Sequence, residues 1–324
     1  MDLKKAFEMR RALAAALVVF LAFSITALAT ETSVMDETPV VRDLKVHTYR
    51  NIPYRAAFLE AEADSGALTY TIVREPKRGT VTIEGTEFIY TPKENKTGRD
   101  SFTYTATDAE GRVSREAKVT VVIEKPKSGV EYSDMEGNAA AAAAQQLAED
   151  GVFVGVRMGN DYYFEPARTV TRSEFLAMTM ETAGMAVTPV TMTGFCDDAA
   201  IPVWAKAYAA SGLSGGVVQG HVTDAGVAFS GDEPITFNQA AAILNRVLSV
   251  SDVDLSVWFA DRGAVPSWAA QAVANMEAVC VMSVGSFGSN TLNESLTRAD
   301  AARMLSNASV LLAGEERTLL SWFA

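Results

Sequence analysis

Cysteine and histidine are scarce in this chain, which has only two of each among its 324 residues. Two cysteines are too few for the disulfide framework of a small secreted domain. The two histidines, His47 and His221, have no cysteine or carboxylate neighbours at a spacing typical of a metal site. The sequence also lacks a nucleophile elbow, a phosphate-binding loop and a metalloprotease helix. We therefore expect neither an enzyme nor a protein that holds a metal or another cofactor.

Basic residues are few in the second part of the chain. Residues 128–324 contain 9 Lys and Arg against 22 Asp and Glu, whereas residues 38–127 contain 15 against 13. An acidic surface repels nucleic-acid phosphates, so the composition argues against DNA or RNA as a partner.

Long apolar runs are absent except at the N-terminus. Four basic residues there precede an apolar run over residues 12–29, which ends in Ala27-Leu28-Ala29. Segments in this order favour a cleaved export signal over residues 1–29 rather than a retained membrane anchor. We expect an exported protein with no membrane span after cleavage. In such a protein Cys196 and Cys280 either form a disulfide or lie apart as small buried residues, and no sequence feature brings them together, which favours the second arrangement.

Five runs in the first part of the chain alternate threonine or charged residues with β-branched or aromatic residues. They cover residues 68–72, 80–83, 86–90, 101–105 and 117–123. Turn signals lie between them at Glu84-Gly85 and at residues 108–111. Short strands at this spacing, without helices, predict an all-β sandwich over residues 38–126.

Three segments of this stretch, 76–82, 88–92 and 98–111, resemble the bacterial immunoglobulin-like and cadherin-like modules of surface proteins. The resemblance implies a spacer or adhesive module whose partners are other surface proteins or ligands from a host or the environment. Asp64, Asp100 and Asp108 either hold Ca²⁺, as in some relatives, or serve turns and helix caps. They lack the spacing of a single-loop calcium cage, which favours turns.

A linker is predicted at residues 125–129, where Lys, Pro, Ser and Gly favour an extended path. The period of the pattern then changes from two to 3.6, and the Ala-rich run 139–147 predicts a helix.

Beyond the linker, one pattern occurs three times. An aromatic-x-Asp sequence opens each unit, and the Asp residues are 63 and 64 positions apart (197 − 134 and 261 − 197). The openings are Tyr132-Ser133-Asp134, Phe195-Cys196-Asp197 and Phe259-Ala260-Asp261. Each unit closes with Thr, two variable residues and an acid or amide, which together form a capping box ahead of an apolar helical run. The boxes begin at Thr171, Thr236 and Thr297.

Each unit therefore reads as helix, loop, helix. Trp204 and Trp268 follow Pro202 and Pro266 by two residues, which places them in the first turn of the first helix. One unit cannot bury its apolar face alone, so the pattern predicts an all-α, three-repeat helical module with pseudo-threefold symmetry.

These motifs resemble the S-layer homology (SLH) domain, with repeats over residues 130–190, 191–253 and 254–314. The family's marks are the aromatic-x-Asp opening, a Trp in the first helix, a turn bounded by glycines and Thr-Arg-Ala-Glu before the second helix. The resemblance implies a cell-surface protein that is held non-covalently on the bacterial cell wall. It implies binding to secondary cell-wall polysaccharide, often with pyruvate ketals, in grooves between repeats.

Arg172 and Arg298 are the first candidate binding residues. A guanidinium offers a planar donor fork to a ketal carboxylate, and the capping box itself does not require Arg at that position. A cation at a helix N-terminus also opposes the helix dipole, which is typical of a residue kept for binding. Each Arg either receives a ligand carboxylate or pairs with a nearby acid such as the Asp that opens a unit.

The other candidates are aromatic and acidic. Trp204 and Trp268 either stack on a sugar face or anchor the core, and a helical Trp beside Pro favours the core. Asp134, Asp197 and Asp261 either accept sugar hydroxyls or cap the first helix of their unit, which is the simpler explanation.

The copies also differ from the family pattern. Phe237 replaces the Arg in the second unit, Ala141 replaces the Trp in the first, and the third unit lacks both turn glycines. We therefore expect fewer than three binding grooves, weaker binding or a differently decorated polymer. A structural S-layer-type lattice subunit and a wall-remodelling enzyme are the alternative functions, and the sequence favours them less.

Overall fold

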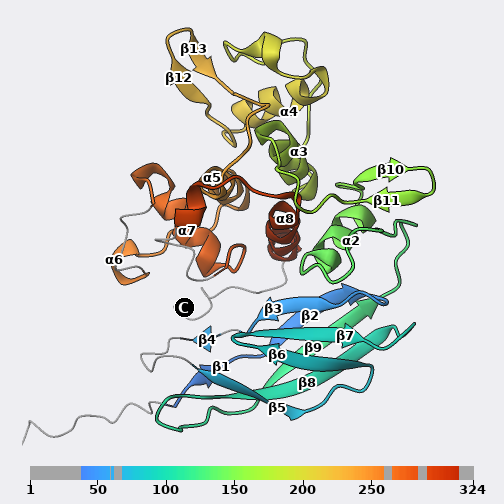
Figure 1. Ribbon diagram of the computed structural model, residues 1–324. Helices are drawn as coiled ribbons and strands as arrows, with labels where there is room; N and C mark the ends of the chain where they lie inside the picture. The colour runs from blue at the N-terminus through green and yellow to red at the C-terminus, as the bar shows by residue number, and fades with distance from the viewer. Residues whose placement is uncertain (1–37, 59, 62–67, 259–264, 284–289, 314–324) are drawn as a thin grey trace, which may run out of the picture.

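A computed structural model describes residues 38–58, 60–61, 68–258, 265–283 and 290–313 of the chain. A β-rich N-terminal region is followed by a helical region, and Figure 1 shows the strands of the N-terminal region at one end of the molecule and the helices above them. The predicted export signal over residues 1–29 lies outside the described residues, and so do Asp64 and the third opening at residues 259–261.

The N-terminal region is a sandwich of two sheets. One sheet has the strand order β2-β9-β8-β5 and the other has the order β3-β7-β6, with β1 and β4 as a short separate pair. The bounds are β1 (Val40–Val41), β2 (Leu44–Tyr49), β3 (Tyr54–Ala57), β4 (Glu60–Ala61), β5 (Thr69–Arg74), β6 (Gly79–Glu84), β7 (Glu87–Pro92), β8 (Gly98–Thr107) and β9 (Ala117–Glu124). Strand β2 runs parallel to β9, and the other pairs are antiparallel. All five predicted strands are confirmed as β5 to β9, whereas β1 to β4 were not predicted.

The alternating pattern fills the space between the two sheets with aromatic rings. Phe88, Tyr90, Phe102 and Tyr104 are fully buried, and the rings of Phe88 and Phe102 meet edge to face with centroids 5.3 Å apart. Aromatic pairs in this geometry add to the stabilisation that burial of their area gives. The opposite faces of the strands carry Thr and charged residues, which explains the period of two in the sequence.

The predicted turns are confirmed. Gly85 joins β6 to β7 with φ of 63°, a conformation that glycine adopts without steric cost. Asp108 accepts hydrogen bonds from the backbone N–H groups of Glu110 (3.1 Å) and Arg112 (2.8 Å), so this carboxylate organises its turn. Asp100 accepts from the N–H groups of Lys77 and Arg78 at 2.9 and 2.6 Å. Both carboxylates thus have structural duties.

The predicted linker lies against the helical region. The carboxylate of Glu149 accepts hydrogen bonds from the backbone N–H groups of Lys127 (2.7 Å) and Ser128 (3.0 Å). Ile52, from the turn that follows β2, packs against the core of the helical region. The two regions are therefore joined by side-chain contacts as well as by the chain itself.

The helical region begins at α2. Its elements are α2 (Ala141–Glu149), β10 (Val156–Met158), β11 (Asp161–Tyr163), α3 (Arg172–Thr182), η1 (Asp198–Ala200), α4 (Val203–Ser214), β12 (His221–Thr223), β13 (Gly226–Ala228), α5 (Phe237–Leu248), α6 (Leu255–Trp258), α7 (Ser267–Ala278), η2 (Asn290–Asn293) and α8 (Arg298–Leu312). All three predicted capping boxes are confirmed, at the starts of α3, α5 and α8. Helices α4 and α7 begin directly after Pro202 and Pro266, as their sequences predict.

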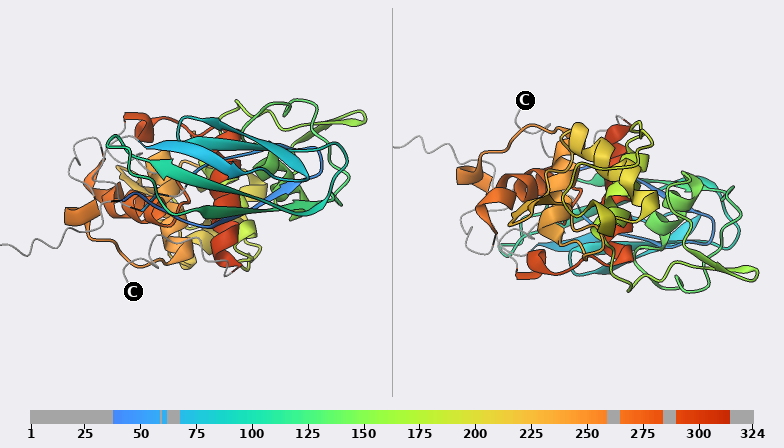
Figure 2. Two further views of the ribbon diagram at one scale, coloured as in Figure 1. Left: turned by 90° about the horizontal axis from the view of Figure 1, so that it is seen from below. Right: turned by 90° about the horizontal axis from the view of Figure 1, so that it is seen from above.

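The helices are arranged in a cycle. Helices α3, α5 and α8 contact one another at the centre, while α4 packs on α3, α7 on α5 and α2 on α8 (Figure 1). The view from above in Figure 2 shows the central helices surrounded by the others. Because α2 packs on α8, the first and last helices of the region are neighbours in space.

A ring of backbone hydrogen bonds joins the segments that precede the three capping boxes. The N–H of Val170 donates to the carbonyl of Leu296 (2.9 Å), Leu296 donates to Ile235 (2.8 Å), and Ile235 donates to Val170 (3.0 Å). All three side chains are buried. The backbone N–H of each segment therefore finds its acceptor in another segment, and all three segments are needed to close the ring.

The expectation of an all-α region is wrong in one respect. The loops of the first two helix pairs contain two-stranded hairpins, β10–β11 and β12–β13. Gly159 turns the first hairpin with φ of 66°, and its Gly-Asn sequence is a hairpin signal that could have been used. The corresponding loop before α8 includes residues 284–289, which lie outside the described residues.

The structure also bears on the two cysteines and on membrane-spanning helices. Neither Cys196 nor Cys280 is in a disulfide, as expected, but Cys196 is exposed, so its predicted burial is wrong. Among the described residues, no helix is long and apolar enough to cross a membrane.

Candidate functional site

The Asp residues that open the first two units hold a loop that lies about thirty residues later in each unit. Asp134 accepts hydrogen bonds from the backbone N–H groups of Phe164 (2.8 Å) and Glu165 (2.7 Å). Asp197 accepts from Phe229 (2.8 Å) and Ser230 (2.7 Å) in the same manner. The second residue of each loop pair is left-handed, with φ of 54° and 53°. The two carboxylates thus stabilise the same uncommon turn.

The prediction that these Asp residues cap the first helix is wrong. The N-cap positions of α2 and α4 are Ala140 and Pro202, and neither helix has a side-chain cap. The partners of Asp134 and Asp197 are distant in sequence, so local spacing could not identify them. The third candidate, Asp261, lies outside the described residues.

The glycines that end the turns after α2 and α4 have a steric role. Gly155 and Gly220 have φ of 70° and 71°. A Cβ atom at Gly155 would lie 2.3 Å from the carbonyl oxygen of Tyr163, and one at Gly220 would lie 2.6 Å from that of Ala228. Each glycine therefore allows its turn to approach the hairpin strand and the aromatic residue that opens the unit.

Arg298 connects the last helix to the loop of the first unit. Its Nη1 donates to the carbonyl of Phe164 (3.0 Å) and to Oε2 of Glu165 (2.8 Å). The guanidinium carbon lies 4.9 Å from the ring centroid of Phe153, a cation–π distance. Only 6% of the side chain is exposed, and this burial lowers the pKa of Arg298 from its ordinary value.

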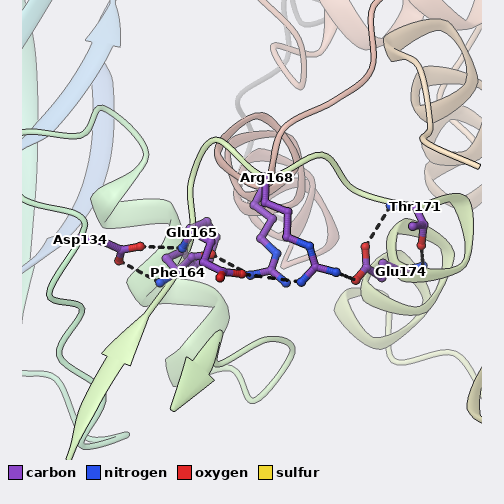
Figure 3. A network of polar contacts seen from close by, with 7 residues as sticks. Asp134, Phe164, Glu165, Arg168, Thr171 and Glu174 are labelled. Carbon is purple, nitrogen blue, oxygen red and sulfur yellow. Dashed lines mark hydrogen bonds and ion pairs between the residues drawn. The ribbon is translucent and has the colours of Figure 1, made fainter. Parts of the chain in front are cut away.

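Arg168 extends this network to the capping box of α3, and sequence reasoning missed it. Its Nη2 donates to Oε1 of Glu174 (3.1 Å), and its Nη1 lies 3.7 Å from Oε2 of Glu165. The other oxygen of Glu174 accepts the N–H of Thr171 (2.9 Å). Figure 3 shows the resulting line of polar contacts from Asp134 to Thr171. Glu174 therefore serves the cap and the network at once.

Arg172 occupies the corresponding place one unit later. Its Nη1 donates to the carbonyl of Phe229 (2.9 Å), and its Nη2 lies 3.9 Å from Oε2 of Glu233. The side chain is 13% exposed, and burial lowers the pKa of Arg172. Both arginines thus pair with an acid, but the acid is Glu165 or Glu233 and not the Asp that opens a unit. Phe237 occupies the third such position, and its backbone N–H donates to the carbonyl of Glu294 (3.3 Å).

A groove of about 240 Å³ lies between α3 and α4. Helix α3 contributes two acids and two apolar side chains, α4 contributes two aromatic rings, and the turn after α2 and the start of α8 complete the lining. The lining residues are Val152, Phe153, Val170, Glu174, Ala177, Met178, Glu181, Trp204, Tyr208 and Arg298. Two predicted site residues, Trp204 and Arg298, therefore meet in one groove.

The tryptophans are surface residues. Trp204 is 52% exposed and Trp268 is 59% exposed, so the prediction that they anchor the core is wrong. Each lies in the first turn of its helix, two residues after the Pro at the N-cap position. Trp268 is on α7, which packs on α5, and it does not line the groove that Trp204 lines.

Charge in the groove is mainly negative. Glu174 and Glu181 line it together with one cation, Arg298. Oη of Tyr208 donates to Oε1 of Glu181 at 2.6 Å, and this bond raises the pKa of Tyr208. Phe153, Tyr208 and Glu181 were not predicted from the sequence. Their role follows only from the packing of α4 against α3.

The positions that correspond to the two groove acids lie on α5. The capping boxes start at 171 and 236, so residues 174 and 181 correspond to Gln239 and Arg246. Nη1 of Arg246 donates to the carbonyl of Val217 (3.1 Å). The residue that corresponds to Tyr208 is Ala272, which is buried. The α3–α4 interface thus has two acids and a phenol at these positions, whereas the α5–α7 interface has an amide, a cation and a methyl group.

The described residues contain no group of three or more His, Cys, Asp or Glu side chains that could hold a metal ion.

The N-terminal region matches a known family model. Residues 36–122 match the family model described as bacterial Ig domain. No model of S-layer homology repeats matches the helical region, and no curated protein matches the chain.

Solved structures resemble part of the chain. The SrpA adhesin from Streptococcus sanguinis is 16% identical over 30% of this chain and 61% of its own, with a TM-score of 0.21. Fibronectin(III)-like modules of Clostridium thermocellum CbhA are 14% identical over 27% and 47%, with a TM-score of 0.20. An endo-fucoidan hydrolase of glycoside hydrolase family 107 is 16% identical over 33% of this chain but only 16% of its own length, with a TM-score of 0.24. The match to the family model indicates an immunoglobulin-like domain of the bacterial type in the β-rich N-terminal region.

Proposed function

We propose that this is an exported cell-surface protein, held non-covalently on the bacterial cell wall by a helical region of three SLH repeats. The repeats bind secondary cell-wall polysaccharide, and the immunoglobulin-like domain serves as a spacer or adhesive module. Bacterial Ig domains are typical of surface or secreted proteins, which supports the location.

The contacts that recur between helix pairs support the repeat assignment. The ring through Val170, Ile235 and Leu296 joins three equivalent segments, and Asp134 and Asp197 make the same pair of bonds. Arg172 and Arg298 donate to equivalent carbonyl groups. The equivalent residues are at least 61 positions apart in the sequence. Local sequence preference alone does not produce matching contacts at such separations.

The observation that carries the binding proposal is the groove between α3 and α4. Its wall includes Trp204, a large apolar ring left half-exposed, and such a ring is suited to stack on the apolar face of a sugar. The groove also contains carboxylate and phenol oxygens that accept or donate hydrogen bonds to hydroxyl groups. An aromatic wall beside a few polar groups is the usual composition of a ligand site.

The position of the immunoglobulin-like domain agrees with a spacer role. In Figure 1 the sandwich lies at the opposite end of the molecule from α4, and none of the residues that line the groove comes from the sandwich. The bonds from Lys127 and Ser128 to Glu149 hold the two regions together at the linker. A protein bound to the wall through the groove would then present the sandwich away from it.

Sedimentation with purified sacculi tests the proposal. The chain should sediment with sacculi that retain their secondary polymer and stay in solution with sacculi from which the polymer has been extracted. Equal binding to naked peptidoglycan would contradict the proposal. Ordered sheets formed by the protein alone would favour a lattice subunit instead.

A further inference from the structure

The groove between α3 and α4 differs from a carboxylate-binding site in its charge and in the state of its arginine. We infer that this groove accepts a sugar unit that bears no carboxylate, recognised by Trp204 stacking and by hydroxyl bonds to Glu181 and Tyr208. The inference rests on the proposed function, because it specifies which part of the wall polymer this groove binds.

Arg298, the arginine that lines the groove, already has hydrogen-bond partners within the protein. Nη1 of Arg298 donates to the carbonyl of Phe164 and to Glu165, and the guanidinium face is covered by Phe153. With 6% of the side chain exposed, a ligand carboxylate reaches Nη1 only if it displaces Glu165. The exchange would replace one carboxylate with another and would gain little.

The acids of the groove oppose an anionic ligand. Glu181 is exposed and Glu174 is partly exposed, and both line the groove. Arg168 is paired with Glu174 and Glu165, so it does not supply a further free cation to the groove. The carboxylates of Glu165, Glu174 and Glu181 thus face two guanidinium groups, and one negative charge remains. This charge repels a ketal carboxylate and favours neutral hydroxyl groups.

The shape of the groove suits one sugar ring. Trp204 and Tyr208 are four residues apart on α4, so their rings lie on the same face of that helix. The volume of about 240 Å³ is smaller than the roughly 300–1,000 Å³ that ligand pockets typically enclose, which limits the groove to a small ligand. The hydrogen bond of 2.6 Å between Tyr208 and Glu181 fixes both groups at the edge of the stacking surface. A hydroxyl-bearing ring on Trp204 therefore meets two oriented acceptors, the phenol oxygen of Tyr208 and the carboxylate of Glu181.

Binding of the full chain to two forms of one polymer tests the inference. The probes are secondary polysaccharide released from sacculi, either intact or treated with mild acid to remove its ketals, and the measurement is calorimetric affinity. Loss of the ketal should change the Kd by less than about twofold, since this groove makes no ion pair with it. The Trp204→Ala variant should weaken binding about tenfold for both forms, by loss of stacking.

The control is Val203→Ala, an exposed residue beside Trp204 that does not line the groove, and it should bind as the parent does. Because both side chains are exposed, thermal unfolding should not differ between the two variants. Binding to the intact polymer alone would overturn the inference and leave the proposed function standing. Binding unchanged by Trp204→Ala would also overturn it, and failure to bind either form would overturn the proposed function as well.

Discussion

The α3–α4 interface and the α5–α7 interface share one architecture and differ in chemistry. Both have an exposed Trp in the first turn of the outer helix and a capping box at the start of the inner one. The first presents Glu174, Glu181 and Tyr208, whereas the second has Gln239, Arg246 and Ala272 at those positions. The two interfaces therefore keep the exposed Trp and the capping box in common and differ in the residues that lie between the helices.

The turn glycines allow the largest test of that shared architecture. Gly155→Ala should lower the free energy of unfolding by about 3 kcal/mol, because the new methyl group meets a carbonyl oxygen and the backbone is left-handed. Chemical denaturation measures the loss. The control is Gly151→Ala, which has φ of 72° but nothing within 4 Å and should cost about 1 kcal/mol. Equal costs for the two variants would show that the close approach at Gly155 is not needed.

The opening carboxylates test whether the two units are equivalent. Asp134→Ala and Asp197→Ala should each lower the free energy of unfolding by about 2 kcal/mol, because two backbone N–H groups lose a charged acceptor. Denaturation of the two variants in parallel makes the comparison. A large loss for one and none for the other would break the equivalence of the units.

The charge difference between the interfaces can be reversed by one substitution. Glu181→Arg places on α3 the residue type that α5 carries at 246, and should raise affinity for ketal-bearing polymer about fivefold at low salt. The gain should fall as salt increases, since the new charge is exposed. Glu136→Arg, an exposed change outside the groove, is the control for net charge. An equal gain from both variants would assign the effect to overall charge rather than to the groove.

The smallest expected effect concerns the phenol that only the first interface has. Tyr208→Phe keeps the ring and removes the hydroxyl that donates to Glu181, so affinity for the ketal-free polymer should fall about threefold. Calorimetry at neutral pH measures it. Thermal stability should change little because the hydrogen bond is exposed. An unchanged affinity would mean that the groove contacts its ligand through stacking alone.

Local features of this molecule followed well from the sequence. The capping boxes at Thr171, Thr236 and Thr297 form as predicted because all of their partners lie within three residues. The five predicted strands form because the alternation of apolar and polar residues places one face in the core. Strands β2 and β3 were missed, since β2 pairs with β9, which is some seventy residues away.

Candidate site residues followed less well, because their roles depend on distant partners. Trp204 is exposed although its sequence context favoured the core, since nothing local shows which face of α4 meets α3. Arg168 was missed because its acids, Glu165 and Glu174, become partners only after the loop has folded over the helix start.

The sequence by itself determined the alternation of the sandwich, the helix starts and the spacing of the recurring motifs, because these depend on backbone preferences and short-range hydrogen bonds. Only the tertiary structure decided what each carboxylate and guanidinium does. Asp134 bonds to a loop thirty residues later, and Arg298 bonds to one more than 130 residues earlier in the chain. Such bonds form only when the ring through Val170, Ile235 and Leu296 brings the three segments together, and no local pattern encodes that closure.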